Sequence, residues 1–331
     1  MQVWIMYSAL KHVFPIFYMF LMLTTLPVVF AANASDHLMI ATNSINTTQP
    51  SLISSNTNES RIKVVASFYP VYEFVKEIGG NKVDVTSLIP IGVEPHDYEP
   101  TIQQIQNAET ADLVVYNGAG LEKWIDKINA KFKVEASQGL NLLMSNDTGN
   151  SGTYDLHVWL DPILAEMEVE NIRNALVKID PANTQYYKAN ADRFIGKLND
   201  LDYRIKTELA TCNKKDFIAF HNAFTYFANR YGLNQHSVHQ GLTPEGEVLP
   251  QRLQGVIELA RDLGLHIVYS EDLVDPRSSE VIAQEIPNGK VLILSPIEGI
   301  NSEEQRAGIG YLDKMNENVE NLKIGLECQL K

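Results

Sequence analysis

The sequence predicts an α/β protein with two lobes, each a mostly parallel sheet flanked by helices, joined by one long rigid helix. Three observations predict this fold. Short β-branched runs alternate with amphipathic stretches, the same alternation returns later in the chain, and an unbroken helical pattern separates the two series. Such alternation favours parallel strands, because each crossover between neighbouring parallel strands usually carries a helix.

The first series begins at the β-branched run 61–67, and a helical pattern over 71–78 follows it. Two further strand-like runs, 83–88 and 112–118, enclose a short amphipathic helix at 102–108. Apolar residues recur every three or four positions in the helical stretches, whereas the strand-like runs are short and β-branched. These elements predict the first lobe.

The second series repeats this rhythm with three strand-like runs, at 216–220, 265–270 and 290–295. A helical pattern follows each run, at 223–231, 278–286 and 303–322. The repetition predicts a second lobe of the same kind.

A long helical pattern lies between the two series, from Pro181 to Leu209. Asp180 is a good N-cap and Pro181 suits the first helical position. At 1.5 Å per residue the helix would be roughly 40 Å long, enough to join two lobes stiffly with a cleft between them. An ordinary packing helix within one domain is the alternative. The predicted division is 61–180 for the first lobe, 181–211 for the linking helix and 212–331 for the second lobe.

The first 60 residues predict export. Residues 13–32 form an uncharged apolar run after Lys11, long enough for a secretory signal or a membrane anchor. We therefore interpret 1–34 as a signal peptide or anchor, and the polar Ser/Thr/Asn-rich stretch 35–60 as a flexible stalk. The folded part is then expected at the outer face of the cytoplasmic membrane, or secreted after cleavage.

Composition narrows the function further. The chain has 41 acidic and 27 basic residues, for a net charge of −14. Proteins that bind nucleic acids need a Lys/Arg-rich surface, so we expect no nucleic-acid partner. The two cysteines, Cys212 and Cys328, are too few for a disulfide scaffold. In an exported protein they are expected to form one bridge that ties the C-terminal helix to the second lobe, and two buried thiols are the alternative.

Three histidines lie near strand ends or helix starts, where ligands collect in open α/β sheets. They are His96 in GVEPHDYEP, His157 in DLHVWLDP and His221 after DFIAF. Asp275, in SEDLVDPR after a late strand, is the fourth candidate, with Glu271 as a rival carboxylate. Imidazole nitrogens with one carboxylate suit a divalent first-row metal, and three imidazoles favour Zn²⁺.

His236 and His239 form a rival pair, but their spacing places them on opposite faces of a strand. The four favoured residues are far apart in the sequence, unlike the paired ligands of a zinc finger. They therefore predict a site assembled by the whole fold, with two ligands from each lobe.

Several segments carry a family resemblance over residues 61–331: SFYPVYEF, IPIGVEPHDYEPT, DLHVWLDP, FHNAFTYFANRYGL, GLTPEGEVLP, SEDLVDPR and LSPIEGI. Together they resemble the zinc- and manganese-binding family of solute-binding proteins that serve ABC importers. The resemblance implies two α/β lobes with a metal in the cleft between them, held by His96, His157, His221 and the carboxylate after the late strand, here Asp275.

The resemblance also implies a function. A monomeric, non-enzymatic protein would capture Zn²⁺, or alternatively Mn²⁺, and deliver it to the permease of an ABC importer. Two departures from the family pattern are visible. The stretch MSNDTGNSGTYDLH lacks the extra histidines of a metal-scavenging loop, and the usual lipid-attachment cysteine is absent.

Neighbours of the predicted ligands are candidates for orienting the rings: Asp97, Glu99, Asp161, Asn222 and Glu271. Two other functions compete with the carrier. An extracellular zinc hydrolase would keep an open water position and a general base, but the sequence has no HExxH motif. A binding protein for a metal chelate, such as a siderophore or haem, would need a wide cleft with arginine or aromatic contacts.

Overall fold

The computed structural model describes residues 61–145, 153–244 and 248–329. They belong to one compact unit, Asn58–Lys331. The predicted leader at 1–34 and the predicted stalk at 35–60 lie outside the described residues. Among the residues described, no helix combines the length and the apolar character needed to cross a membrane.

The first lobe is built on a four-stranded parallel sheet with the order β2-β1-β3-β4. Its strands are β1 Ile62–Ala66, β2 Val83–Ser87, β3 Leu113–Tyr116 and β4 Lys133–Glu135, and its first helices are α1 Tyr69–Gly79 and α2 Ile102–Glu109. The central strand β3 is almost entirely buried, whereas the edge strand β2 alternates between buried and open positions. This difference explains the continuous apolar run of β3, since helices cover both faces of a central parallel strand.

The second lobe repeats the same strand order, β6-β5-β7-β8, again all parallel. Its elements are β5 Asp216–Ala219, α5 Thr225–Tyr231, β6 Asn234–Ser237, α6 Pro250–Asp262, β7 Ile267–Ser270, α7 Arg277–Glu285 and β8 Lys290–Ile293. In both sheets the order reverses beside the first strand, which creates the crevice where ligands bind in open α/β sheets. The predicted two-lobed α/β fold is thus confirmed.

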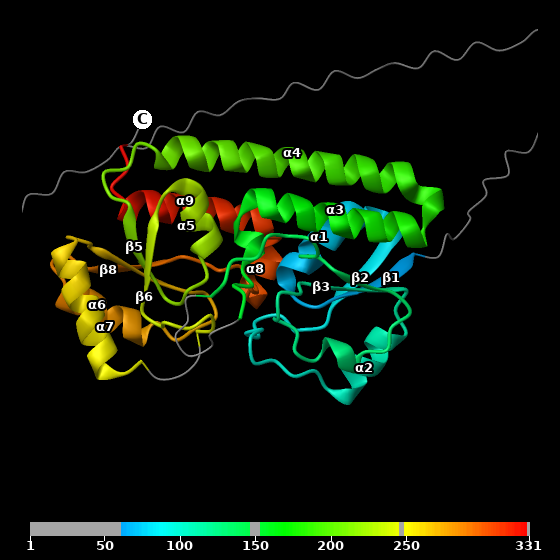
Figure 1. Ribbon diagram of the computed structural model, residues 1–331, viewed down its shortest axis with the longest axis horizontal. Coiled ribbons are helices and arrows are strands. Elements are labelled where there is room, and N and C mark those ends of the chain that lie inside the picture. Colours follow the sequence, from blue (N-terminus) through cyan, green and yellow to red (C-terminus); the bar gives the residue numbers. More distant parts are fainter. Residues whose placement is uncertain (1–60, 146–152, 245–247, 330–331) are drawn as a thin grey trace, which may run out of the picture. The chain divides into compact units, whose positions relative to one another are not determined.

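Helices α3 Pro162–Ile179 and α4 Thr184–Leu209 lie between the two sheets in sequence, and α8 Ser302–Ala307 and α9 Tyr311–Gly325 close the chain. Helix α4 runs past both lobes (Figure 1). It contacts α1 and α3 on the side of the first lobe, and α5 and α9 on the side of the second. The long helical pattern therefore corresponds to a helix that packs against both lobes.

The buried stripe of α4 explains this position. Its apolar side chains recur at spacings of three and four and are all buried: Tyr187, Ala191, Phe194, Leu198, Leu201, Ile205 and Leu209. Asp180 and Pro181 precede the helix in a short 3₁₀ turn, Pro181–Asn183, so the regular α-helix starts three residues later than predicted. The stripe covers a single core that includes Val64 and Val114 of the first sheet and Phe217 and Tyr269 of the second.

A second, smaller core lies on the other face of the second sheet. It joins Val268 of β7 to Ile257 of α6 and Ile282 of α7. The second lobe therefore has helices packed on both faces of its sheet, as the sequence predicts for a parallel sheet.

The predicted Cys212–Cys328 disulfide is present. It joins the residues after α4 to those after α9, and the Lys214 N–H donates to the Leu326 carbonyl beside it at 3.0 Å. The bridge thus anchors the end of the C-terminal helix beside the start of the second sheet.

Some elements differ from the prediction. The helix expected at 303–322 is two helices, because Gly308 adopts a left-handed conformation (φ 73°) that ends α8. Strand β4 (KVE) was missed, and β6 (NQHS) was expected only as the strand that carries His236, because both strands are short and polar. Both are edge strands, where packing on the neighbouring strand replaces an apolar pattern of their own.

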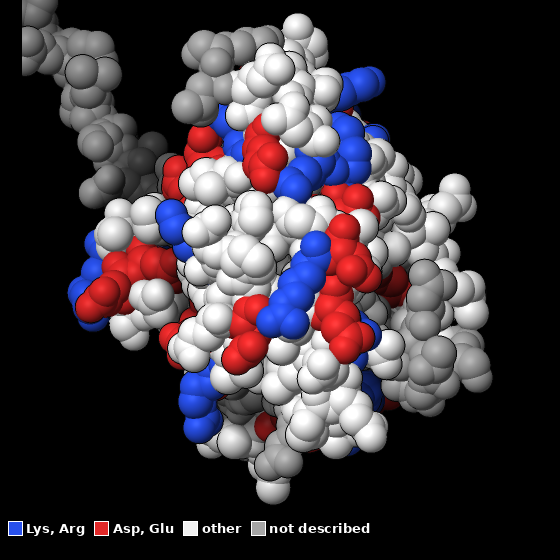
Figure 2. All heavy atoms as spheres, turned by 90° about the vertical axis from the view of Figure 1, so that its left-hand side faces the viewer, with Lys and Arg blue, Asp and Glu red and all other residues white. Residues whose placement is uncertain are grey.

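The surface carries charges of both signs. Figure 2 shows acidic and basic side chains interleaved on the face turned to the viewer, without one large patch of either sign there.

Candidate metal centre

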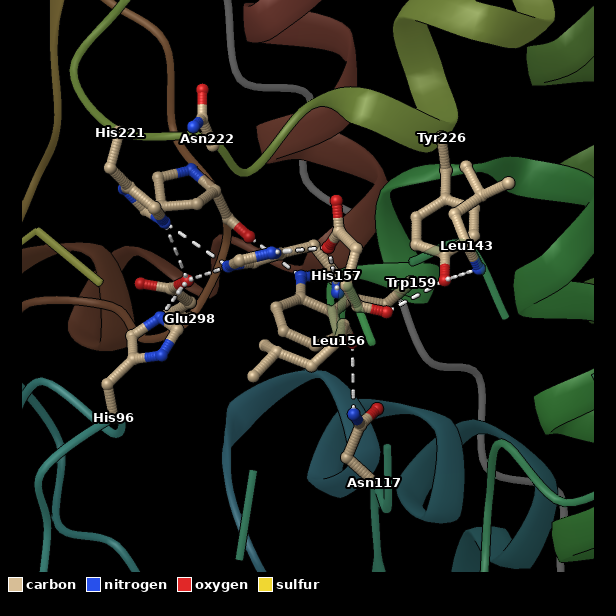
Figure 3. A network of polar contacts seen from close by, with 12 residues as sticks. His96, Asn117, Leu143, Leu156, His157, Trp159, His221, Asn222, Tyr226 and Glu298 are labelled. Atoms are coloured by element: carbon tan, nitrogen blue, oxygen red, sulfur yellow. Dashed lines mark hydrogen bonds and ion pairs between the residues drawn. The ribbon is translucent and has the colours of Figure 1, made fainter. Parts of the chain in front are cut away.

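Three imidazoles and one carboxylate meet in the interior of the protein: His96, His157, His221 and Glu298. One ligand atom from each lies within 4.8 Å of the others, and all four side chains are buried. Glu298 Oε1 lies 2.9 Å from His96 Nε2, 3.1 Å from His157 Nε2 and 3.6 Å from His221 Nε2. Figure 3 shows the three rings around this carboxylate.

The four residues come from four separated segments. His96 lies in the loop between β2 and α2, and His157 comes directly before a 3₁₀ turn that leads into α3. His221 follows β5, and Glu298 lies between β8 and α8. Each lobe therefore supplies two of the residues, from segments that follow the carboxyl ends of strands, as the sequence predicts for a site assembled by the whole fold.

The loop that carries His96 is anchored by the first turn of α2. Gln104 completes a capping box with Thr101, accepts a hydrogen bond from Tyr98 Oη at 2.8 Å and donates to the Leu88 carbonyl at 2.9 Å. The Glu94 carboxylate accepts the His96 backbone N–H at 3.1 Å. These contacts hold the loop at both ends, so the ring enters the site from a fixed backbone.

The other two rings are oriented by buried carboxylates. His157 Nδ1 lies 2.8 Å from Asp155 Oδ1, and His221 Nδ1 lies 2.7 Å from Glu271 Oε1. An N–H at Nδ1 that donates to a carboxylate leaves Nε2 as the atom that can bind a metal. The two Nε2 atoms are 3.2 Å apart and both face Glu298.

The buried carboxylates of the site favour positive charge on two of the imidazole rings. Burial lowers the pKa of His157 and His221, but the surrounding carboxylates outweigh it. Asp155 and Glu298 raise the pKa of His157, and Glu271 and Glu298 raise that of His221 to about 10. Burial prevails at His96, whose pKa is lowered. Burial alone would raise the pKa of Glu298, but the imidazoles bring it well below its usual value.

A strained backbone precedes Glu298. Ile297 is buried and has a φ of 58°, in the left-handed region that β-branched residues avoid. Its N–H donates to Ser295 Oγ at 3.1 Å, and the indole N–H of Trp159 donates to the Pro296 carbonyl at 2.7 Å. Strain of this kind costs about 1–3 kcal/mol and persists only where neighbours hold the segment, which is common at functional sites.

The placement predicted for Asp275 needs correction. Its side chain is 54% exposed, and its carboxylate pairs with Arg277 at 2.6 Å. The carboxylate beside the histidines belongs to Glu298, in the segment LSPIEGI after the last strand. Asp275 belongs to the exposed loop between β7 and α7.

Of the five residues predicted to orient the rings, Glu271 has this contact, because its carboxylate lies beside the Nδ1 atom of His221. Asp97 is exposed, and Glu99 pairs with Lys127 at 2.8 Å. Asp161 caps α3 and pairs with Arg230, and the Asn222 side chain donates to the Gln240 carbonyl. Three of these four residues therefore have other partners, and Asp97 lies at the surface.

The rival histidine pair also has other contacts. His236 Nε2 lies 2.9 Å from Asp216 Oδ1, between β6 and β5. His239 stacks against Phe220, with ring centroids 5.1 Å apart. Neither belongs to the cluster of potential ligands found among the described residues.

Sequence reasoning missed Asp155, the partner of His157, and the position of Glu298. Asp155 comes two residues before His157, a spacing that lets one carboxylate accept both the backbone N–H and the ring N–H of the histidine. Glu298 stands after a strand like the other candidates, so its topological position was a usable signal.

A divalent transition metal suits this donor set. Three imidazole nitrogens and one carboxylate oxygen match the four-coordinate preference of Zn²⁺. An ion at the centre would compensate the buried carboxylates, which are costly to leave unpaired. Four protein donors would fill all four positions of a tetrahedral zinc ion.

Comparison with known proteins agrees with this geometry. The sequence pattern of the family described as "ZnuA: Zinc-uptake complex component A periplasmic" matches residues 64–325. The high-affinity zinc uptake system protein ZnuA of Bacillus subtilis is 37% identical over an alignment of 289 residues that covers 82% of this chain and 90% of that protein. The zinc-binding lipoprotein AdcA of Streptococcus pneumoniae is 32% identical over 281 residues.

The match to AdcA covers 80% of this chain and 56% of that protein, so AdcA is much the longer of the two. The Zn(II)-bound ZnuA-like domain of the same AdcA has a solved crystal structure. It superimposes with a TM-score of 0.72 at 31% identity, covering 81% of this chain and 99% of that domain.

Proposed function

Because this chain belongs to the family of periplasmic zinc-uptake components, we propose that it captures Zn²⁺ outside the cytoplasm and delivers it to the permease of an ABC importer. One observation carries the proposal. The three imidazoles and Glu298 converge in the interior, with their ligand atoms within 4.8 Å of one another, from segments contributed by both lobes.

Zinc is favoured over manganese by the donor atoms. Three nitrogens and one oxygen suit Zn²⁺, whereas Mn²⁺ prefers oxygen donors and higher coordination numbers. The solved Zn(II)-bound relative supports the same choice. Mn²⁺ remains the second candidate.

The closed coordination sphere favours a carrier over a zinc hydrolase. A catalytic zinc ion usually keeps three protein ligands and one position for water. We propose that Glu298 takes this fourth position, and all four side chains are at least 95% buried. A chelate such as haem is far larger than a metal ion. It would not fit between four ligand atoms that lie within 4.8 Å of one another.

The proposed role in zinc import requires that the protein be exported. A protein that delivers zinc to an importer has to act outside the cytoplasmic membrane. One of the relatives of this chain is a zinc-binding lipoprotein. In this chain we propose that the apolar segment at 13–32 directs export, either as a cleaved signal or as an uncleaved anchor. The disulfide suits an oxidising compartment.

The decisive experiment measures metal content and affinity. The protein is purified, stripped with a chelator and titrated with Zn²⁺ and Mn²⁺ in competition with a chromogenic chelator. We expect one Zn²⁺ per chain, bound more tightly than Mn²⁺. A protein that binds neither ion would contradict the proposal, and so would turnover of ester or peptide substrates that depends on zinc.

Delivery is tested in cells. In a strain that lacks this protein, uptake of radioactive zinc from zinc-limited medium should fall, and the wild-type gene should restore it. A His221→Ala gene, expressed to the same level, should not restore uptake. Uptake that is restored equally by both genes would exclude a role for the site in transport.

A further inference from the structure

Helix α9 has a buried lysine that is not among the four proposed ligands. Lys314 is 1% exposed. Its Nζ lies 2.8 Å from Asp272 Oδ1, 2.7 Å from Glu304 Oε1 and 3.3 Å from Glu317 Oε2. Lysine is almost never buried this fully without ionic partners, so these contacts form a fixed ion cluster.

Two of its partners belong to the segments that carry carboxylates of the metal centre. Asp272 directly follows Glu271, whose carboxylate holds the ring of His221. Glu304 lies in α8, which immediately follows the segment with Glu298. One ammonium group therefore joins the segment after β7 to the segment after β8.

Two asparagines on the same face of α9 bind the end of β8 and the segment that follows it. Asn318 lies four residues after Lys314, and Asn321 lies three residues after Asn318, which places all three on one side of the helix. Asn318 accepts the Ser295 N–H at 2.7 Å and donates to the Ser295 carbonyl at 2.6 Å. Asn321 donates to the Ile293 carbonyl at 2.8 Å. This face thus holds the strained segment that ends in Glu298.

We propose that Lys314 is a positioning residue for the metal centre, fixing the segments of Glu271 and Glu298 relative to each other. The inference rests on the proposed metal-binding function. A buried ion cluster adds little net stability compared with apolar packing, so its retention calls for another reason. Holding the carboxylates in place before the metal arrives reduces the ordering cost of binding, which tightens binding and slows release.

The test compares Lys314→Met with a matched control on the same helix. Lys323 also lies on α9 and pairs with Glu208 at 2.8 Å and Glu320 at 3.1 Å, away from both carboxylate segments. Zinc affinity, the rate of zinc release to an excess of chelator, and the absorption spectrum of the Co²⁺-substituted protein are measured for wild type, Lys314→Met and Lys323→Met.

We expect Lys314→Met to weaken zinc binding by about tenfold or more, as the loss of groups that orient metal ligands does, with faster release and an altered Co²⁺ spectrum. Lys323→Met should behave as wild type in all three measurements. A Lys314→Met protein with wild-type affinity and spectrum would overturn the inference, even if its melting temperature were lower.

Two further variants keep Lys314 and remove one contact each, in case Lys314→Met does not fold. Asp272→Asn weakens the contact with the segment after β7, and Glu304→Gln weakens the contact with α8. Each should alter the Co²⁺ spectrum and accelerate zinc release, and wild-type behaviour of both would refute the inference. Failure of the wild-type protein to bind zinc would instead refute the proposed function, so the two failures are distinguishable.

Discussion

At the scale of single residues, Glu298 provides the one carboxylate oxygen among the proposed ligand atoms. Binding free energies of structural zinc sites correspond to about 3 kcal/mol per ligand, or about 100-fold in affinity. Glu298→Gln keeps the shape but removes the charge, so we expect zinc affinity to fall by about this factor in a competition titration.

The matched control is Asp275→Asn, which changes the carboxylate that the sequence favoured. Asp275 is exposed and pairs with Arg277, so its replacement should leave zinc affinity unchanged. Loss of affinity in Asp275→Asn, with retention in Glu298→Gln, would reverse the correction made by the structure.

Protons compete with the metal for the same nitrogens. In the metal-free protein the pKa of His157 is raised and that of His221 is raised to about 10, so His221 is protonated at neutral pH. A protonated ring must lose its proton to bind zinc, so affinity rises with pH and is lost as the pH falls. The pKa of His96 is lowered, so this ring adds no released proton at pH 7.

We therefore expect between about one and two protons released per zinc ion at pH 7, and a dissociation constant that falls about tenfold or more per pH unit from pH 6 to 8. Calorimetry in two buffers of different ionisation enthalpy measures the released protons. Glu271→Gln should reduce the number, because it removes the carboxylate that raises the pKa of His221 most. A dissociation constant independent of pH would contradict this account.

The carboxylates behind the rings give a further prediction. Asp155→Asn and Glu271→Gln each remove the charged partner of a ring nitrogen. Changes of this kind cost about 10–100-fold in metal affinity. Glu99→Gln serves as the control, since Glu99 lies near His96 in sequence but pairs with Lys127 at the surface. Equal affinities in all three variants would show that the two carboxylates do not orient the rings.

A residue of the site could be predicted where its own stretch of sequence is distinctive. The three histidines stood out because few histidines follow strands in this chain. The choice of carboxylate failed, because acidic residues follow several strands and their direction depends on the backbone. Asp275 is exposed beside Arg277, whereas Glu298 is buried and follows Ile297, whose left-handed conformation the sequence pattern does not predict.

At the scale of elements, the long, periodic ones were predictable and the short ones were not. Helix α4 has a seven-member apolar stripe, which fixes its type and its buried face. Strand β6 has the sequence NQHS and forms because β5 offers it a free edge, an interaction between residues distant in the chain. The break between α8 and α9 depends on Gly308. The sequence pattern predicted one continuous helix across this glycine.

Helix α4 gives a testable consequence of this packing. Leu198 lies near its middle and is completely buried in the core that both lobes share. Leu198→Ala should lower the free energy of unfolding by about 2–5 kcal/mol, through lost transfer energy and the cavity left behind. Denaturant titration measures the change. Lys188→Ala, at an exposed position of the same helix, should change it by less than about 0.5 kcal/mol.

At the scale of the whole molecule, the disulfide and the metal centre act on different properties. Cys212 and Cys328 are separated by 116 residues, so the bridge restricts a large loop of the unfolded chain. In the chain-entropy model this contributes about 4–5 kcal/mol. We expect the double variant Cys212→Ala/Cys328→Ala to melt at a lower temperature but to bind zinc within about threefold of wild type, because neither cysteine contacts a ligand. A large loss of zinc affinity in a folded double variant would show that the bridge also shapes the site.

The shared core makes a last prediction about cooperativity. Side chains from both sheets belong to one continuous cluster, and α4 packs against helices of both lobes. The lobes should therefore unfold together, in one calorimetric transition whose enthalpy agrees with the van't Hoff value. The proposed zinc site takes two ligands from each lobe, so a free zinc concentration 1,000 times the dissociation constant should stabilise the whole unit by about 4 kcal/mol. Two separate transitions, with only one of them raised by zinc, would show that the lobes are energetically independent and that the ion is held by one of them.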